Sequence, residues 1–246
     1  MVFLPNDEFL DEVEAIARIG ADRVLGYWRH LEPGEIDEKA RNDLVTDADR
    51  ASESAILAEI GRRFPDHAVL SEESGWSRRT GSGPTWVVDP LDGTTNFVRG
   101  FPHFGVSVGV TLDGRVVAGV IIDPVKGDVF RAARGEGAFW NGKPCRVSDR
   151  TDLSGTFIAT GFPFRAHRLL DPYLAIFRDI FLGCSGIRRP GAAALDFAYL
   201  ACGIFDGFFE FQLSPWDVAA GSLLVEEAGG MVTDMDGGQD FLTTGD

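Results

Sequence analysis

The chain has 246 residues, which is enough for one large domain or for two closely joined halves. Hydrophobic residues make up 44% and charged residues 25%, as in an ordinary globular protein, and no apolar run reaches the roughly 18 residues of a membrane span. The formal net charge of −15 disfavours direct binding to nucleic acid, because an acidic surface repels the phosphate backbone.

The N-terminus and the cysteines indicate a cytoplasmic protein. Residues 1–11 carry acids where a signal peptide carries basic residues, so we do not expect export. Cys145, Cys184 and Cys202 are far apart and match neither a zinc-binding spacing nor a disulfide framework. We therefore predict no disulfide and a reducing compartment.

The N-terminal half is predicted to begin with two helices and to continue as a sheet. Apolar residues recur at helical spacing over residues 7–28 and 48–63. A strand at 68–71 and a polar, glycine-rich loop precede an apolar run at 86–89 that is typical of a buried strand. Alternating residues then predict an antiparallel meander with strands at 103–112, 115–123, 128–133 and 138–140 and turns at Asp113-Gly114 and Asn141-Gly142.

Beyond a soft boundary near residues 145–155, strands and helices alternate. The predicted strands are 156–160, 204–211 and 230–233, and the predicted helices are 170–181, 191–203 and 216–228. Such blocks predict stacked layers of sheet and helix. We expect a single domain over residues 1–246, whose halves, about 1–150 and 151–246, are not stable separately.

Two carboxylates follow the buried strand in the segment WVVDPLDGTTNF, residues 86–97. A tight turn fixed by Pro90 would bring Asp89 and Asp92 together and leave the carbonyl of Leu91 facing the same point. Two unpaired carboxylates about 4 Å apart repel by about 4 kcal/mol at an effective dielectric of 20, and a shared divalent cation reverses that cost. Oxygen ligands favour magnesium, manganese or calcium over zinc. The alternative is a turn whose acids cap the next helix.

Three other acids could complete a metal and water site. Glu72 ends the strand 68–71, Asp217 lies in the first turn of the helix 216–228, and Asp49 lies at the start of the helix 48–63. Taken singly, the first two are better explained as an exposed acid and a helix-start residue. For the third, N-terminal capping of the helix by Thr46 or Asp47 is the alternative.

The segment Gly93-Thr94-Thr95-Asn96 is predicted to begin a short helix. Free amides at a helix start bind phosphate well, and the hydroxyl of Thr94 could orient a water. The segment is not a Walker loop, because no Gly-Lys-Ser/Thr follows it.

Together these segments resemble the inositol monophosphatase family, whose members are magnesium-dependent, lithium-sensitive phosphatases. The resemblance rests on residues 86–97 and on WDVAAGSLLVEEAGG at 216–230, and it spans nearly the whole chain. Further matches occur in the expected order at Lys39, 43–49, 71–74, 100–104 and 188–194. The resemblance implies a mixed α and β fold, the five-layered αβαβα sandwich of the sugar phosphatases, and a homodimer.

The resemblance also implies the ligands of two or three magnesium ions. Glu72, Asp89 and the carbonyl of Leu91 would hold one ion, and Asp89, Asp92 and Asp217 would hold a second. A third, weaker ion would lie near Glu72 through waters. Manganese would be a possible substitute, and calcium or lithium would inhibit.

The remaining implied roles concern water and substrate. Thr94 with Asp49 would help to activate the attacking water, and Glu72 would act through the same metal-bound water. The amides of Gly93 and Thr94 would hold the phosphate, with Asp92 and Asp217 beside it. The other implied substrate contacts are Gly191, Ala193 and Glu210 around the alcohol, and Lys39 on a mobile loop near the metals.

The sequence leaves the substrate and a second class of function open. Histidinol phosphate, fructose 1,6-bisphosphate and 3′-phosphoadenosine 5′-phosphate are alternatives to inositol monophosphate, and Gly161-Phe162-Pro163-Phe164 replaces a polar pocket segment of the animal enzymes. A regulatory protein that binds transcription machinery is the non-enzymatic alternative. The sequence stops at Asp246, where relatives usually continue through a strand and a helix, so we expect a truncated or unrecorded tail.

Overall fold

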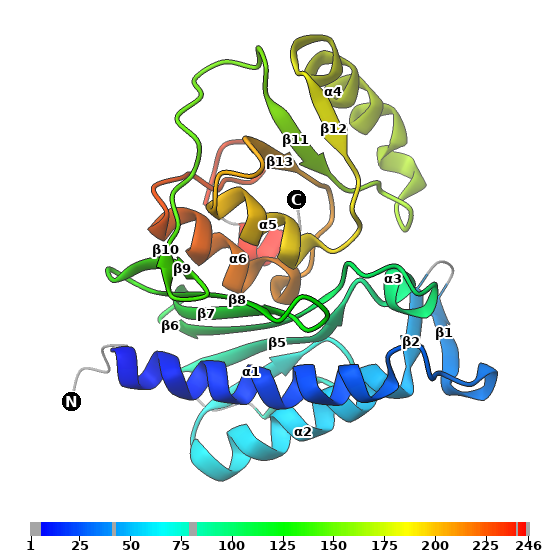
Figure 1. The fold of residues 1–246 in the computed structure, drawn as a ribbon, viewed down its shortest axis with the longest axis vertical. Helices are drawn as coiled ribbons and strands as arrows, with labels where there is room; N and C mark the ends of the chain where they lie inside the picture. The colour runs from blue at the N-terminus through cyan, green and yellow to red at the C-terminus, as the bar shows by residue number, and fades with distance from the viewer. Residues whose placement is uncertain (1–5, 41–42, 79–82, 240, 245–246) are drawn as a thin grey trace.

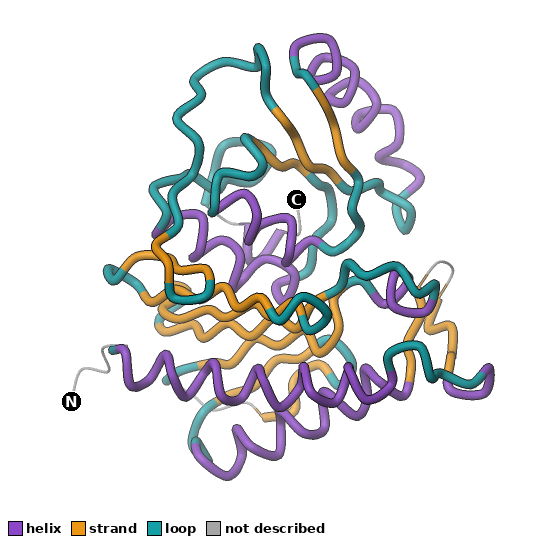
Figure 2. The backbone as a smooth tube through the Cα atoms, viewed as in Figure 1, coloured by secondary structure: helices purple, strands orange, loops and turns teal. Residues whose placement is uncertain are grey.

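The fold is a stack of five layers, alternately of helices and of sheet (Figures 1 and 2). The computed structural model describes residues 6–40, 43–78, 83–239 and 241–244. The layers are the helix pair α1 and α2, an eight-stranded sheet, the helix pair α5 and α6, a three-stranded sheet, and α4. This arrangement confirms the predicted αβαβα sandwich.

The first layer consists of α1 (Asp7–Tyr27) and α2 (Asp47–Arg63), close to the two predicted helices. The side chain of Asn6 caps α1 by accepting a hydrogen bond from the amide of Phe9 at 2.9 Å. The two helices touch at Gly20, where an added Cβ would lie 2.5 Å from Cδ1 of Ile56. This close approach lets both helices bury their apolar faces on the large sheet.

The large sheet has the strand order β10-β9-β8-β7-β6-β5-β3-β4. Its strands are β3 (Ala68–Ser71), β4 (Gly75–Arg78), β5 (Thr85–Asp92), β6 (Gly105–Leu112), β7 (Arg115–Asp123), β8 (Asp128–Ala133), β9 (Gly137–Trp140) and β10 (Lys143–Pro144). β3 pairs with β5 in parallel, and the other pairs are antiparallel. The predicted meander is confirmed, and its hairpin turn at Asp113-Gly114 has φ values of 51° and 77°.

The N-terminal half also contains a hairpin and a strand that the sequence did not predict, and a short helix that it did. An antiparallel hairpin of β1 (Ile36–Ala40) and β2 (Asp43–Thr46), which was not predicted, carries Lys39. β4 lies in what was predicted to be a polar loop. The short helix α3 (Thr94–Val98) follows β5, as the sequence predicts.

The other face of the large sheet is covered by α5 (Ala193–Ala201) and α6 (Pro215–Glu227). Two glycines permit this contact, because an added Cβ at Gly109 would lie 2.9 Å from Cβ of Ala219 and one at Gly119 would lie 2.8 Å from Cα of Ala220. Beyond these helices lies the parallel sheet β12-β11-β13, and beyond it α4. The bounds are β11 (Phe157–Thr160), α4 (Leu170–Gly183), β12 (Gly186–Arg188), β13 (Gly207–Phe209) and a final α7 (Phe241–Thr244).

The predicted closing strand at 230–233 was wrong. These residues form no strand, and the amide of Gly230 donates instead to the carbonyl of Val225 at 2.8 Å. Met231 is 82% exposed, so its apolar side chain takes no part in a sheet face. The strand predicted at 204–211 is likewise shorter, because only Gly207–Phe209 pair with β11.

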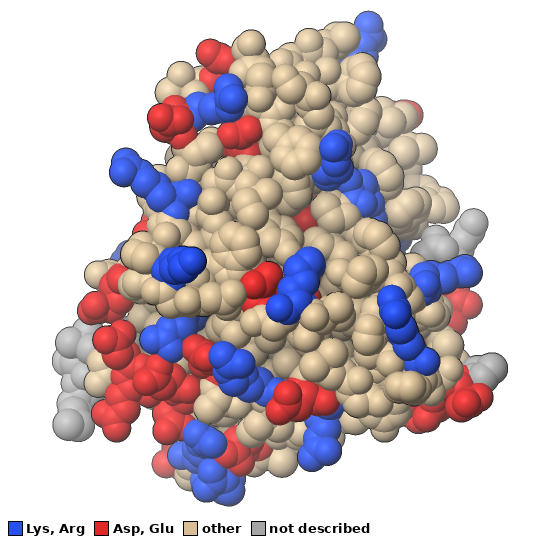
Figure 3. All heavy atoms as spheres, viewed as in Figure 1, with Lys and Arg blue, Asp and Glu red and all other residues tan. Residues whose placement is uncertain are grey.

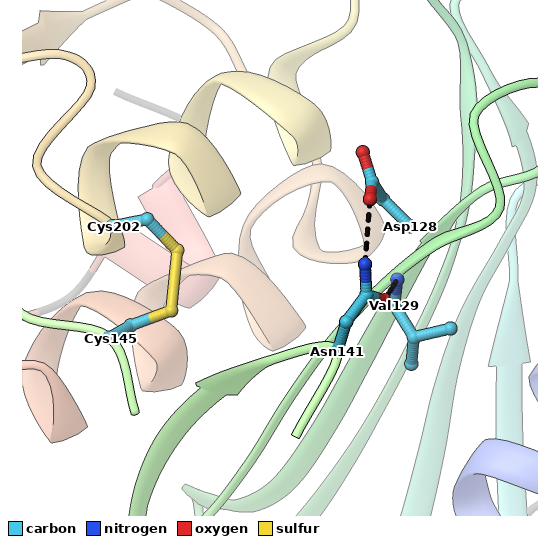
Figure 4. Close-up of a disulfide and its surroundings, with 5 residues drawn as sticks. All are labelled: Asp128, Val129, Asn141, Cys145 and Cys202. Carbon is cyan, nitrogen blue, oxygen red and sulfur yellow. Dashed lines mark hydrogen bonds between the residues drawn. A yellow bond between two sulfur atoms is a disulfide. The ribbon is translucent and has the colours of Figure 1, made fainter. Parts of the chain in front are cut away.

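The prediction of no disulfide was also wrong. Cys145 and Cys202 are joined by a disulfide, with Cα atoms 4.6 Å apart, and Cys184 is free (Figure 4). The two cysteines are separated by 57 positions in the sequence, so their spacing gave no indication of a pair. The fold brings them together by placing the segment after β10 against the end of α5.

The surface carries acidic and basic side chains side by side on the face shown in Figure 3. Arg131 on β8, for example, pairs with Asp11 at 2.6 Å and with Glu14 at 2.9 Å on α1. Ion pairs at the surface contribute little stability each. Among the helices that the structure describes, none is long and apolar enough to span a membrane.

Candidate metal and phosphate site

Two buried carboxylates and one partly buried carboxylate converge where the end of β5 meets the start of α6. One oxygen each of Asp89, Asp92 and Asp217 lies within 4.8 Å of the others. Asp89 is 1% and Asp92 9% exposed, so water screens little of their mutual repulsion. The structure thus brings together the three acids that the sequence assigned to one metal.

A β-bulge explains how two acids of one strand point to the same place. The predicted tight turn after Asp89 was wrong, because β5 continues through Pro90 and Leu91 to Asp92. Asp89 pairs with Ser107 of β6 while Asp92 pairs with Gly105, so β5 holds one extra residue. Side chains alternate along a regular strand, and the extra residue returns the second acid to the face of the first.

Short contacts hold the bulge in shape. The amide of Leu91 donates to Oδ1 of Asp89 at 3.0 Å, and the hydroxyl of Ser52 on α2 donates to the carbonyl of Pro90 at 2.8 Å. The carbonyl of Leu91 lies 3.0 Å from the hydroxyl of Thr94. A carbonyl oxygen has two lone pairs, so this contact leaves one for a cation.

Burial and mutual repulsion raise the pKa values of all three acids. The pKa of Asp89 is well above its ordinary value, first through burial and then through the charges of Glu72, Asp92 and Asp217. Burial and Asp217 raise the pKa of Asp92 in the same way. Burial raises the pKa of Asp217 to about 7, against hydrogen bonding from the amide of Ser214 at 2.6 Å. Such a set of oxygen donors fits a hard divalent cation, which would replace the protons.

Glu72 lies beside this trio rather than within it. Its amide bonds to the carbonyl of Val88 at 3.1 Å as β3 ends next to β5, and its carboxyl lies within hydrogen-bonding reach of Asp89. Lys39, on the β1–β2 hairpin, lies 3.2 Å from Oε1 of Glu72 and 2.5 Å from Oε1 of Glu73. The sequence singled out Lys39 and Glu72, but it gave no indication that they would contact each other.

Asp49 and Thr94 are in direct contact, 45 residues apart in the sequence. The hydroxyl of Thr94 lies 3.1 Å from Oδ1 of Asp49, whose other oxygen accepts hydrogen bonds from the amide and the hydroxyl of Thr46. The capping alternative is therefore also true, since Thr46 and Asp49 form a capping box. Burial raises the pKa of Asp49 to about 6, so it can both cap the helix and accept a proton.

The start of α3 lies against the start of α5. Gly93 has a φ of 87°, and an added Cβ would lie 3.1 Å from Cβ of Ala192 and 3.2 Å from the carbonyl of His103. The side chain of Asn96 donates to the carbonyls of His103 at 2.7 Å, Pro190 at 2.9 Å and Gly191 at 3.3 Å. Asn96 was not a predicted site residue, although it lies within the segment 86–97, because only the fold shows what it bridges.

These contacts predict that a side chain at position 93 destabilises the protein. We expect Gly93→Ala to lower the free energy of unfolding by about 2–3 kcal/mol, through the left-handed φ and the crowding against Ala192. Gly114→Ala is the matched control, because Gly114 has a φ of 77° and nothing within 4 Å of an added Cβ. Urea unfolding measures both, and equal losses would contradict the role of the α3–α5 contact.

The residues predicted to contact the alcohol lie at the start of α5 and after the end of β13. Gly191 and Ala193 flank Ala192, and the amide of Ala194 donates to Oδ2 of Asp92 at 2.7 Å. Glu210 follows β13, and its carboxyl lies against Gly161, where an added Cβ would lie 1.8 Å from it. Burial raises the pKa of Glu210 to about 8. Ala194 lies in the matching segment 188–194, and Gly161 lies in the segment that replaces a polar pocket segment of the animal enzymes, but the sequence did not indicate which acids they would contact.

A sequence profile described as the inositol monophosphatase family matches residues 6–246. The chain belongs to the inositol monophosphatase family. Its relatives include a protein named Nus factor SuhB from Pseudomonas aeruginosa, 46% identical over 233 residues that cover 93% of this chain and 86% of the relative. The resemblance inferred from residues 86–97 and 216–230 is thereby confirmed.

Solved structures of other proteins share the fold. The extragenic suppressor protein SuhB of Bartonella henselae superposes with a TM-score of 0.89 at 41% identity, covering 95% of this chain and 90% of that one. An inositol monophosphatase from Anabaena (Nostoc) superposes with a TM-score of 0.86 at 40% identity, covering 97% and 88%. The relatives thus carry three kinds of name: Nus factor, extragenic suppressor protein and inositol monophosphatase.

Proposed function

We propose that this chain is a magnesium-dependent phosphomonoesterase that hydrolyses inositol monophosphate or a similar small phosphate ester. The observation that carries the proposal is the convergence of Asp89, Asp92 and Asp217, with Asp49 and Thr94 in contact beside them. A protein that only binds a partner has no need of three acids that converge at one point, since they cost stability unless a cation joins them. The family name and the phosphatase relatives support the same proposal.

Phosphate-ester hydrolysis depends mainly on positioning and on charge neutralisation, which are what this site offers. Glu72, Asp89, Asp92, Asp217 and the carbonyl of Leu91 would hold the ions. Bound magnesium would supply positive charge for the phosphoryl oxygens and would lower the pKa of a water.

The protein's own groups have distinct tasks in this scheme. The hydroxyl of Thr94 orients the attacking water, and Asp49, 3.1 Å away, accepts a proton through it. The amides of Gly93 and Thr94 hold phosphoryl oxygens at the start of α3. On the alcohol side, Gly191, Ala193 and Glu210 contact the leaving group, and at neutral pH the raised pKa of Glu210 leaves it largely protonated and able to donate a hydrogen bond.

The substrate, the ions and the catalytic cluster are tested by one panel of assays. We expect phosphate release from inositol 1-phosphate that requires magnesium, is partly supported by manganese, and is inhibited by calcium and by lithium at millimolar-range concentrations. Histidinol phosphate, fructose 1,6-bisphosphate and 3′-phosphoadenosine 5′-phosphate complete the panel. Absence of release from every ester at any magnesium concentration would refute the phosphatase proposal, whereas release without lithium inhibition would favour one of the other esters.

A second candidate function follows from the relatives named Nus factor SuhB. We propose that the chain also binds the transcription machinery through a protein contact, since its net charge of −15 disfavours direct contact with RNA. Co-sedimentation with purified RNA polymerase tests this, using the wild type and Asp89→Asn. Binding by both would separate the regulatory role from catalysis, and binding by neither would remove it.

The proposed cellular setting is a cytoplasmic homodimer. The Nus-factor relatives, all bacterial, support the cytoplasm, and the family resemblance supports the dimer. Analytical ultracentrifugation gives the oligomeric state directly.

A further inference from the structure

The disulfide joins two elements that are each held in place independently. The amide of Cys145 donates to the carbonyl of Ala138 at 2.8 Å, and the amide of Cys202 donates to that of Ala198 at 3.3 Å. The backbones of the two segments also touch, because an added Cβ at Gly203 would lie 3.0 Å from the carbonyl of Arg146. The bond therefore connects the edge of the large sheet to the C-terminal end of α5 (Figure 4).

Both cysteines of the disulfide line a surface cavity of about 360 Å³. Cys145 and Cys202 are partly exposed, and Lys143 and Arg146 line the same cavity. The disulfide-bonded residues thus border a space that a small thiol can enter without unfolding the protein. Nearby cations lower the pKa of a thiol and favour its thiolate, which is the group that leaves when a disulfide is attacked.

Whether a disulfide is a permanent structural bond depends on the redox state of the compartment. In the bacterial cytoplasm, structural disulfides are rare, and those present are mostly transient or redox-sensing. This step rests on the cytoplasmic location given under the proposed function. The disulfide borders a cavity that Lys143 and Arg146 also line, and Cys184 takes no part in it. These features are more typical of an exchangeable disulfide than of a permanent one.

We propose that Cys145–Cys202 is a thiol–disulfide exchange site that a dithiol reduces in the folded protein, and that its reduction loosens the C-terminal end of α5. A dithiol thiolate attacks one cysteine sulfur, forms a mixed disulfide and releases the other cysteine as a thiolate. The second thiolate of the reagent then attacks its own sulfur in that mixed disulfide and releases the second cysteine. The protein gains two electrons, and the reagent leaves as the oxidised disulfide.

The exchange matters to the site because α5 reaches from the disulfide to the acids. At its first turn, the amide of Ala194 holds Oδ2 of Asp92 at 2.7 Å, and Cys202 caps its last turn. Leu195, Ala198 and Ala201 are fully buried, so the reduced helix remains packed on the core. Reduction thus changes how firmly one end of α5 is held without unfolding it.

Counting reactive thiols by intact mass after alkylation tests the exchange. Under native conditions without reductant, we expect iodoacetamide to label Cys184 alone. After dithiothreitol treatment of the folded protein, we expect labels on Cys145, Cys184 and Cys202. Labelling of all these cysteines before reduction would refute the disulfide, and a requirement for urea during reduction would refute exchange in the folded protein.

Thermal unfolding with and without dithiothreitol tests how much the disulfide stabilises the protein. We expect dithiothreitol to lower the Tm of the wild type by roughly 5–10 °C, because the bond closes a loop of many residues. Cys184→Ser is the matched control and should show the same fall. Cys145→Ser and Cys202→Ser should have a lower Tm that dithiothreitol leaves unchanged, and a dithiothreitol effect in either would refute the assignment.

Hydrogen exchange locates the effect without relying on the variants or on phosphate release. We expect the amides of residues 199–203 to exchange faster in the reduced wild type, while those of α1 are unchanged. Equal exchange of residues 199–203 in both redox forms would overturn the loosening of α5. Neither result depends on the phosphatase proposal.

Discussion

Asp89→Asn is expected to lower magnesium-dependent phosphate release by about 10³-fold or more while the protein stays folded, because phosphoryl transfer depends on charge neutralisation at this point. Asp89 is the one acid assigned to both principal ions. In the wild type, the amide of Leu91 donates a hydrogen bond to Oδ1 of Asp89 at 3.0 Å. Asparagine keeps an oxygen that can accept this bond, so the bulge can persist. The measurement is the steady-state rate of phosphate release over a magnesium titration.

For Asp89→Asn we expect lower activity but higher stability of the metal-free protein. At pH of about 8, the metal-free wild type must either bury like charges or hold protons on these acids at a cost, whereas asparagine is neutral without a proton, so the metal-free variant should unfold at a higher temperature than the metal-free wild type. Asp113→Asn is the control, because it makes the same chemical change at an exposed hairpin turn with a left-handed φ that asparagine tolerates. Undiminished turnover in Asp89→Asn would refute the metal assignment.

The layered fold could be predicted because its periodic segments are long and consistent. The helices α1 and α2 and the strands β6 to β8 follow directly from apolar spacing, with Asp113-Gly114 as a turn of the type that joins such strands. The parts that were missed are short or charged. β1 is IDEKA and β4 is GWSR, and neither has a stripe of apolar residues that would separate a strand from a loop.

The convergence of Asp89 and Asp92 was predicted from their own segment, and Glu72, Asp49 and Asp217 were added through the family resemblance, but the backbone geometry that brings the acids together could not be predicted. Asp89 and Asp92 are three positions apart, which on a regular strand places them on opposite faces, and only the bulge against Ser107 and Gly105 brings them together. Asn96 and the Cys145–Cys202 pair depend on contacts between segments distant in sequence. Such contacts are properties of the packed layers and have no local pattern.

The acid cluster also predicts an unusual dependence of stability on pH in the metal-free protein. The pKa of Asp217 rises from its ordinary 3.8 to about 7 on folding, and that of Asp49 to about 6. A group whose pKa is higher in the folded state favours folding when it is protonated. Its contribution is therefore complete below pH of about 4 and is lost as the pH rises through about 6 for Asp49 and about 7 for Asp217.

Magnesium should reverse this loss. Because the cation displaces protons from the acids, its binding becomes stronger as the pH rises, and it should stabilise the protein much more at pH of about 8 than at pH of about 5. At a hundredfold excess over its dissociation constant, a ligand adds about 2.7 kcal/mol, or a Tm rise on the order of 5–10 °C for a chain of this size. Differential scanning calorimetry in EDTA and in magnesium at both pH values measures the effect.

Two controls separate cation binding from general screening of an acidic protein. Sodium chloride at matched ionic strength should raise the Tm far less than magnesium does, since Asp89 and Asp92 are buried and salt screens buried charges poorly. Asp89→Asn should lose most of the magnesium response at pH of about 8 and keep its response to sodium chloride. A metal-free Tm that stays level between pH of about 5 and 8, or an equal magnesium effect at both, would show that Asp217 and its neighbours do not hold the protons that the cation is expected to displace.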